Sequence, residues 1–198
     1  MVTCDFEDRL ARAKAGDEGC FVELFRSVQP ALLRYLGTVG GSLAEDVAGE
    51  TWVSVVRGLH RFSGDEDGWR AWVFTIARAR LRDAQRRAAR APQMVEAFDT
   101  LESRPDSLDV AAHVEQIFST EAALALIRRL PRDQAEAVML RHVAGLDVAR
   151  TAKVLGKRSG AVRVAAHRGL RRLSEMLGGD DEQQAAEGCN GIDANSGK

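Results

Sequence analysis

Residues 145–177 read GLDVARTAKVLGKRSGAVRVAAHRGLRRLSEML, and this stretch decides the fold of the region around it. Asp147 is a residue type that caps helices, and apolar residues at helical spacing follow it until Gly156, a typical helix end. A turn at Lys157 and Arg158 then leads into a second helical pattern. Two short helices across a glycine-containing turn indicate a helix-turn-helix.

The second helix of this motif is basic. Val162 and Ala166 fall on its apolar side, as the period of an amphipathic helix requires. A basic helix after such a turn favours DNA binding. The alternative is a solvated charged face on an ordinary helical corner, since such corners are common in all-α proteins. The residues that project from its other sides are Arg163, His167, Arg171 and Arg172.

The composition favours a globular all-α protein. The chain has 198 residues, of which 45% are hydrophobic, and this suffices for one large domain or two small ones with modest cores. Strand signals are scarce, and the Asn190-Gly191 pair lies in a polar tail without flanking strand patterns. We therefore expect two small helical domains.

The sequence predicts neither a membrane segment nor a catalytic centre. The first residues, MVTCDFEDRL, lack a secretory signal pattern, and the longest apolar run, 122–127, is too short to cross a bilayer. Cys4, Cys20 and Cys189 are far apart and odd in number, which favours neither disulfides nor a metal site. No nucleophile, base and metal-ligand set has workable spacing. We expect a cytoplasmic protein with no cofactor, no membrane insertion and no enzyme activity of its own.

Charge is segregated along the chain. Two basic blocks separated by an acidic connector suggest two contacts with a polyanion, whereas an average surface intersperses both signs. Chance clustering in an arginine-rich protein is the alternative. Counted from Asp, Glu, Lys and Arg, the net charge is −5 over residues 1–68, +6 over 69–91, −6 over 92–121, +8 over 122–177 and −4 over 178–198.

The first basic block forms a regular stripe on the helix expected from residue 69 to residue 90. Its arginines recur every fourth residue, which spaces guanidinium groups by roughly 6 Å per step along one helix face. That spacing suits a phosphate backbone. The stripe consists of Arg78, Arg82, Arg86 and Arg90, with Arg80 and Arg87 beside it.

An earlier helix, expected over residues 42–59, combines acidic and aromatic side chains. Ser42 and Glu45 have the spacing of a capping box at its start. Asp46 and Glu50 lie one turn apart, with Trp52 nearby. This group is a candidate protein-docking surface, although ordinary acidic residues at a helix start explain the pattern equally well.

The remaining segments separate and follow the two domains. Residues 92–119 contain two prolines and mostly acidic or small residues, which predicts a flexible acidic linker. Residues 178–198 have almost no large apolar side chains, which predicts a disordered tail. The domains are therefore expected over residues 1–91 and 120–177.

Three stretches together resemble the extracytoplasmic-function sigma factors, the compact two-domain members of the sigma-70 superfamily in bacteria. The resemblance covers roughly residues 17–177, and the order and spacing of the stretches make it specific. A regulator of the LuxR type, which acts alone through a helix-turn-helix, would match only the last stretch. The three are AEDVAGETWVSVVRGL (44–59), RAWVFTIARARLRDAQRRAAR (70–90) and LIRRLPRDQAEAVMLRHVAGLDVARTAKVLG (126–156).

The resemblance implies partners and site residues. Core RNA polymerase and promoter DNA are the implied partners, and an anti-sigma factor is a further one that the family allows. The implied core-polymerase contacts are Asp46, Val47, Glu50, Trp52 and Val53. The implied contacts to the minus-10 element, which this part would recognise and open, are Arg61, Phe62, Ser63, Arg78, Arg82, Arg86 and Arg87. The implied contacts to the minus-35 element are Lys157, Arg158, Ser159, Gly160, Arg163, His167, Arg168, Arg171 and Arg172.

The chain departs from the family pattern at several positions. Gly49 stands where Gln is usual and Ala79 where Asn is usual. Arg150-Thr151 replaces a usual Glu-Ile pair, and Val164-Ala165 replaces a Ser-Arg-like pair in the second helix of the motif. The promoter sequence therefore does not transfer from the resemblance. The two functions left open are a promoter-specificity subunit of RNA polymerase and a free-standing DNA-binding regulator.

Overall fold

The computed structural model describes residues 5–90 and 121–189, with side chains up to residue 177. Within these ranges the chain is helical and contains no strand, which confirms the all-α prediction. The linker expected at residues 92–119 and the end of the tail lie outside the described residues.

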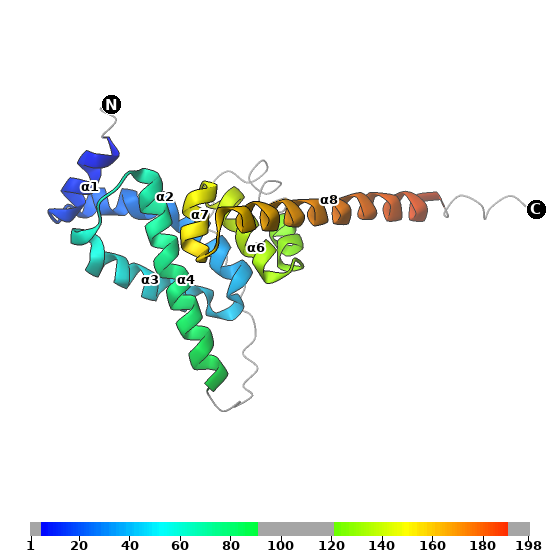
Figure 1. Cartoon of the computed structure of the whole chain (residues 1–198), viewed down its shortest axis with the longest axis horizontal. Coiled ribbons are helices and arrows are strands. Elements are labelled where there is room, and N and C mark those ends of the chain that lie inside the picture. Colours follow the sequence, from blue (N-terminus) through cyan, green and yellow to red (C-terminus); the bar gives the residue numbers. More distant parts are fainter. Residues whose placement is uncertain (1–4, 91–120, 190–198) are drawn as a thin grey trace, which may run out of the picture.

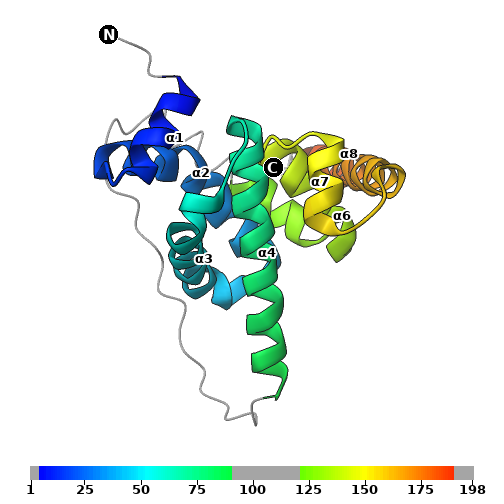
Figure 2. The same cartoon turned by 60° about the vertical axis from the view of Figure 1, so that its left-hand side comes forward.

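Four helices form the first half of the structure (Figures 1 and 2). Aspartates start the first two helices, because Asp5 accepts a hydrogen bond from the Phe6 amide and Asp17 accepts one from the Cys20 amide. Short 3₁₀ turns flank the third helix. The helices are α1 (Phe6–Lys14), α2 (Glu18–Val39), α3 (Ala44–Gly58) and α4 (Glu66–Arg90).

The capping box expected at Ser42 is absent. Residues Gly41–Leu43 form a 3₁₀ turn that begins at Gly41 with a φ of 58°, so Ser42 lies inside this turn. Leu43 occupies the N-cap of α3 and makes no side-chain capping bond. The turn therefore displaces the start of the helix to Ala44 and leaves Ser42 out of capping range.

The second half contains the expected helix-turn-helix. Asp147 caps α7 by accepting a hydrogen bond from the Arg150 amide at 2.7 Å, and Gly156 ends it in the left-handed region with a φ of 63°. Both were predicted from the sequence. Residues 121–128 are helical as well. The other elements are α6 (Arg132–Val138), a π-helical turn (Met139–Val143), α7 (Val148–Leu155) and α8 (Ser159–Cys189).

Helix α8 is longer than expected. It runs to Cys189 and extends from the body of the molecule as a rod (Figure 1), whereas the sequence predicted a disordered tail from residue 178. That segment lacks large apolar residues, but it contains no proline and is rich in the helix formers Glu, Gln and Ala. Elongating a helix that packing has already started needs no new nucleus, and the helix continues through Gly178, Gly179 and Gly188 although glycine is a poor helix former.

The two halves pack directly against each other through one continuous hydrophobic core. Helix α4 packs on α3 and also on α7, and α2 packs on α6 and on the π-helical turn. Trp69, Tyr35 and Phe74 are fully buried in the first half, and Met139 and Leu140 are fully buried in the second. The structure thus places the helix-turn-helix against the basic helix α4. The division into separately folding domains stays a prediction.

Candidate nucleic-acid interface

The start of α8 presents the basic surface that the sequence predicted. Val162 is fully buried, and Ala165 and Ala166 are buried beside it. A Cβ at Gly169 would lie 2.7 Å from Val138 Cγ2, so this glycine lets α8 approach α6 closely. Ser159 is half-buried. The remaining predicted contacts are exposed: Lys157, Arg158, Gly160, Arg163, His167, Arg168, Arg171 and Arg172.

The arginine stripe on α4 divides into an exposed part and a buried part. Arg82, Arg86 and Arg90 are exposed, as the phosphate-spaced pattern predicted. Arg87 is exposed too, and its guanidinium forms an ion pair with Glu50 of α3 at 2.9 Å. That contact raises the pKa of Arg87. Arg78, in contrast, is 7% exposed and lies at the contact between the two halves.

Arg78 binds groups of the second half of the chain. Its Nε and Nη2 atoms donate to Glu136 Oε2 at 3.3 and 3.1 Å, and its Nη1 donates to the Val154 carbonyl oxygen at 3.3 Å. Glu136 is 5% exposed. In this arrangement Arg78 is therefore not available to DNA, contrary to its place in the predicted stripe.

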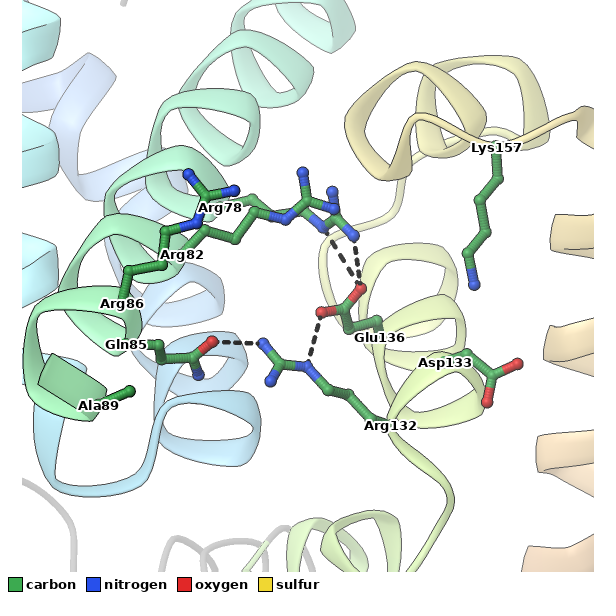
Figure 3. Close-up of a pocket in the computed structure, with 9 residues that line it drawn as sticks. All are labelled: Arg78, Arg82, Gln85, Arg86, Ala89, Arg132, Asp133, Glu136 and Lys157. Carbon is green, nitrogen blue, oxygen red and sulfur yellow. Dashed lines mark hydrogen bonds and ion pairs between the residues drawn. The ribbon is translucent and has the colours of Figure 1, made fainter.

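A groove of about 890 Å³ lies between α4 and the second half (Figure 3). Arg132 crosses it, donating to Gln85 of α4 at 2.8 Å and to Glu136 Oε1 at 3.3 Å. Its charged lining is mostly basic. The lining residues are Arg78, Arg82, Gln85, Arg86, Ala89, Arg132, Asp133, Glu136 and Lys157.

A second polar contact joins the halves where α4 begins. Arg150 of α7 donates to Asp65 at 2.7 Å and to Asp147 at 2.6 Å, and Asp67 lies 3.5 Å away. The Gly68 amide and Arg150 lower the pKa of Asp65, and the Arg150 amide and guanidinium lower that of Asp147. The hydrogen bonds that the Arg150 guanidinium donates to the carboxylates of Asp147 and Asp65 raise the pKa of Arg150. Arg150, which departs from the family pattern, thus forms a specific contact between the two halves of this chain.

The loop before α4 differs from its prediction at one residue. Arg61 and Ser63 are exposed, but Phe62 is 8% exposed. Its ring stacks on Trp72 with centroids 5.0 Å apart and meets the Trp69 ring edge-on at 5.5 Å. Phe62 is therefore a core residue in this structure, because the tryptophans of α4 offer it an apolar surface.

The α3 surface keeps part of the predicted docking group. Asp46 is exposed, and Val53 is 51% exposed. Val47 is 1% exposed and packs in the core, so the structure does not place it on the docking surface. Trp52 is half-buried against Phe21 and Phe25 and donates its indole N–H to Gln29 at 2.6 Å.

The sequence did not predict two residues, one on the α3 surface and one at the contact between the two halves. Val56 of α3 is 55% exposed, and no residue pattern singled it out as a surface residue. Val56 thus extends the exposed apolar area of α3 beside Val53. Glu136, the buried partner of Arg78, had no signal in the sequence, since nothing local distinguishes it from a solvated acidic residue in a helix.

The described residues offer no site for a metal ion. Across residues 5–90 and 121–177, no three His, Cys, Asp or Glu side chains gather closely enough to hold one. None of the helices in the described part is long and apolar enough to span a membrane.

Each half of the chain matches the model of a known protein family. Residues 24–91 match the family model of sigma-70 region 2, and residues 120–173 match that of sigma-70 region 4. The first match covers α3 and α4, and the second covers the helix-turn-helix. A free-standing regulator with a helix-turn-helix accounts only for the second match.

Curated relatives match along most of the chain. The sigma factor ShbA of Streptomyces griseus is 36% identical over 83% of this chain and 91% of its own length. SigD of Mycobacterium tuberculosis is 33% identical over 85% of this chain and 82% of its own length. BldN of Streptomyces coelicolor is 34% identical over 85% of this chain, and the match spans 64% of BldN.

Solved structures share the fold. CnrH bound to the cytosolic domain of CnrY superposes with a TM-score of 0.58 at 24% identity, over 89% of this chain and 99% of CnrH. RpoE of Bartonella quintana bound to the anti-sigma factor NepR gives a TM-score of 0.57 at 22% identity, over 79% of this chain and 96% of RpoE. With both regions matched in order and relatives matched at this level, the chain belongs to the extracytoplasmic-function sigma factors of the sigma-70 superfamily.

Proposed function

We propose that this chain binds core RNA polymerase in the bacterial cytoplasm and directs it to a specific set of promoters. The observation that carries the proposal is the ordered match of regions 2 and 4 to the two parts of the chain that expose basic surfaces. Polymerase performs the chemistry of RNA synthesis, and this chain supplies recognition without being an enzyme itself.

The two basic surfaces divide the promoter between them. The start of α8 suits the major groove of the minus-35 element, where Arg163 lies close enough to the helix start to reach base edges. The exposed arginines of α4, with Arg61 and Ser63 of the preceding loop, suit the backbone and bases of the minus-10 element. Arg78 joins this group only when the second half of the chain moves away from it.

The exposed face of α3 suits a docking surface for polymerase. Exposed Asp46 and half-buried Glu50, which is paired with Arg87, supply negative charge there, and Val53 and Val56 supply exposed apolar area. Charge steers the encounter, while apolar burial sustains the complex.

Replacing both acids tests the docking surface. Asp46→Arg together with Glu50→Arg should abolish co-elution with core polymerase, because the docking surface then carries the opposite charge. Asp46 is exposed and the Glu50–Arg87 ion pair lies at the surface, so losing them should cost little stability and the helical circular dichroism signal should not change. Glu7→Arg with Glu18→Arg is the matched control, since both acids are exposed and precede the region 2 match. If the α3 variant still co-elutes with core polymerase, Asp46 and Glu50 are not part of the interface.

A mobility-shift titration with and without core polymerase tests the function itself. We expect the free chain to bind promoter DNA weakly and without selectivity, because acidic segments compete for its basic surfaces. The complex with core should bind specifically. Tight, sequence-specific binding by the free chain would contradict the proposal and favour a regulator that acts alone.

A further inference from the structure

We propose that Lys14, the last residue of α1, positions the segment between α3 and α4 for reading the minus-10 element. We call this segment, residues 59–65, the minus-10 loop. The inference rests on the proposed function, because the loop has this role only if the chain reads a promoter. Helix α1 precedes the region 2 match, which begins at residue 24. Lys14 is thus a positioning residue that acts on DNA through the loop.

Phe62 is the fixed centre of the minus-10 loop. Its amide donates to the Leu59 carbonyl oxygen at 3.1 Å, and its ring lies against the rings of Trp69 and Trp72. Its own carbonyl oxygen accepts a hydrogen bond from Lys14 Nζ at 2.5 Å. Of these contacts, the one with Lys14 comes from outside the loop and α4, and it ties the loop to a third element of the fold.

The hydrogen bond from Lys14 fixes the peptide plane that joins Phe62 to Ser63. The carbonyl of one residue and the amide of the next are coplanar, so a shift of the Phe62 carbonyl also moves the backbone of Ser63. Arg61 and Ser63 flank Phe62 and are both exposed, and they are the loop residues that suit the minus-10 element. Lys14 therefore controls how the loop presents these two side chains.

Helix α1 is anchored well enough to support the loop. It packs on α2, and its residues Phe6, Leu10 and Ala13 are buried. Arg12 forms an ion pair at 2.6 Å with Asp17, the residue that caps α2. The end of α1, where Lys14 lies, is thus joined to the start of α2.

A hollow of about 470 Å³ lies between α1 and the minus-10 loop. Leu10 and Lys14 line it from α1, and Ser63, Gly64 and Asp65 line it from the loop. Packing therefore does not hold Ser63 from this side, and the bond from Lys14 ties the preceding carbonyl to α1 at that point. The far end of the loop is held separately, because the Asp65 carboxylate accepts from the Gly68 amide at 2.7 Å.

Amide hydrogen exchange of the free chain tests the contact. Lys14→Met keeps the aliphatic stem but removes the ammonium, and an exposed position at a helix end tolerates such a change. We expect the hydrogen-bonded Phe62 amide to exchange about tenfold faster, because the loop opens locally more often. Lys14→Arg keeps a cationic donor and should restore most of the protection. Arg34→Met, which removes an exposed positive charge from α2, is the matched control and should change nothing there.

A promoter library selected with the complex of core and this chain tests the role. Lys14→Met should lower discrimination at one or two minus-10 positions about tenfold, within the range that one base contact supplies, and should leave the minus-35 preference unchanged. Lys14→Arg should recover it. In a chain that already carries Arg61→Ala and Ser63→Ala, Lys14→Met should cost no further discrimination, because the side chains that it positions are absent.

The outcomes separate this inference from the proposed function. Unchanged exchange of the Phe62 amide in Lys14→Met overturns the inference, as does an unchanged minus-10 preference or an effect fully additive with the loop substitutions. An equal loss on every minus-10 sequence, with a salt slope lower by about one unit, would mean that Lys14 binds phosphate itself and also overturns it. Failure of the wild-type complex to discriminate promoters contradicts the proposed function, and exchange in the free variants still decides whether Lys14 holds the loop.

Discussion

Two arginines of α4 have opposite environments although the sequence places them in one stripe. Arg78 is buried and bound to Glu136, whereas Arg86, two turns further, is exposed and lies 3.7 Å from Asp83 of its own helix. The difference comes from the second half of the chain, because α7 packs on α4, and Glu136 of α6 and the Val154 carbonyl of α7 bind Arg78. Helical spacing thus predicts which residues share a helix face. Whether each residue is buried or exposed depends on what packs against that part of the face.

The energetic consequences differ as much as the environments. An exposed ion pair such as Arg86 with Asp83 contributes about 0–1 kcal/mol, since water and salt screen it. A buried pair is costly to form, and the removal of one partner is more costly, because an uncompensated charge remains. The buried region of α4 therefore helps to hold the two halves together, and its exposed region faces solvent.

The largest expected effect follows from breaking the buried pair. Arg78→Ala should lower the free energy of unfolding measured by denaturant titration by about 3–5 kcal/mol, because Glu136 remains buried without its partner. Arg86→Ala, the control from the exposed part of the stripe, should change it by about 0.5 kcal/mol or less. Equal effects of the two substitutions would contradict the contrast between them.

Substitutions on the two exposed surfaces should differ in kind. Arg163→Ala should relax sequence preference at one or two upstream positions by about 1–3 kcal/mol, as the loss of a bidentate base contact does. A promoter library selected with the complex of core and this chain measures that preference. If binding falls equally on every upstream sequence, then Arg163 holds phosphate instead.

The exposed arginines of α4 should act without sequence preference. Replacing Arg82, Arg86 and Arg87 by Ala should reduce strand opening at all promoters and lower the salt-dependence slope by roughly one unit for each lost phosphate contact. Permanganate footprinting detects the strand opening, and binding titrations at several salt concentrations give the slope. An unchanged slope would mean that these arginines make no phosphate contact.

A smaller effect is expected at the helix-turn-helix cap. Asp147→Ala removes the hydrogen bond to the Arg150 amide and should lower the free energy of unfolding by about 1 kcal/mol. Asp147→Asn, which keeps a capping oxygen, should recover most of the loss. Thermal melts of the three proteins at one salt concentration test this, and equal melting of Ala and Asn variants would show that charge rather than capping matters.

The smallest effect is expected on the pH dependence of stability, through the exposed contact between Arg150 and Asp65. The pKa of Asp65 is lowered in the folded chain, so its carboxylate stabilises the fold above its ordinary value of 3.8, and this contribution is lost as pH falls through the lower folded value. The stability difference between wild type and Asp65→Asn should therefore be largest near neutral pH, decline as pH falls below 3.8, and vanish only below the lowered pKa of the folded chain. A difference that grows in acid would contradict the direction of this shift.

Local features of the fold were predictable from the sequence. The structure confirms the cap at Asp147, the helix end at Gly156 and the buried positions Val162 and Ala166 of α8. Each of these depends on a pattern that spans only one or two helix turns. Ser42 failed as a cap for an equally local reason, because a 3₁₀ turn at Gly41 precedes the helix. Family resemblance added the order of the two regions, which no single helix indicates.

Long-range features were not predictable in the same way. Arg78 meets Glu136 across 58 positions and Arg150 meets Asp65 across 85, so no periodicity within one helix reports either contact. The family resemblance implied a DNA contact for Phe62, but Trp69 and Trp72 bury it. Roles that depend on packing between halves therefore required the structure.

Run-off transcription tests the central claim most directly. Core polymerase is incubated with a library of genomic fragments, with or without this chain, and the transcript ends are sequenced. We expect the chain to induce discrete transcripts that share upstream and downstream promoter elements at one spacing, and we expect none of these with core alone. Identical transcripts with and without the chain would contradict its assignment as a promoter-specificity subunit.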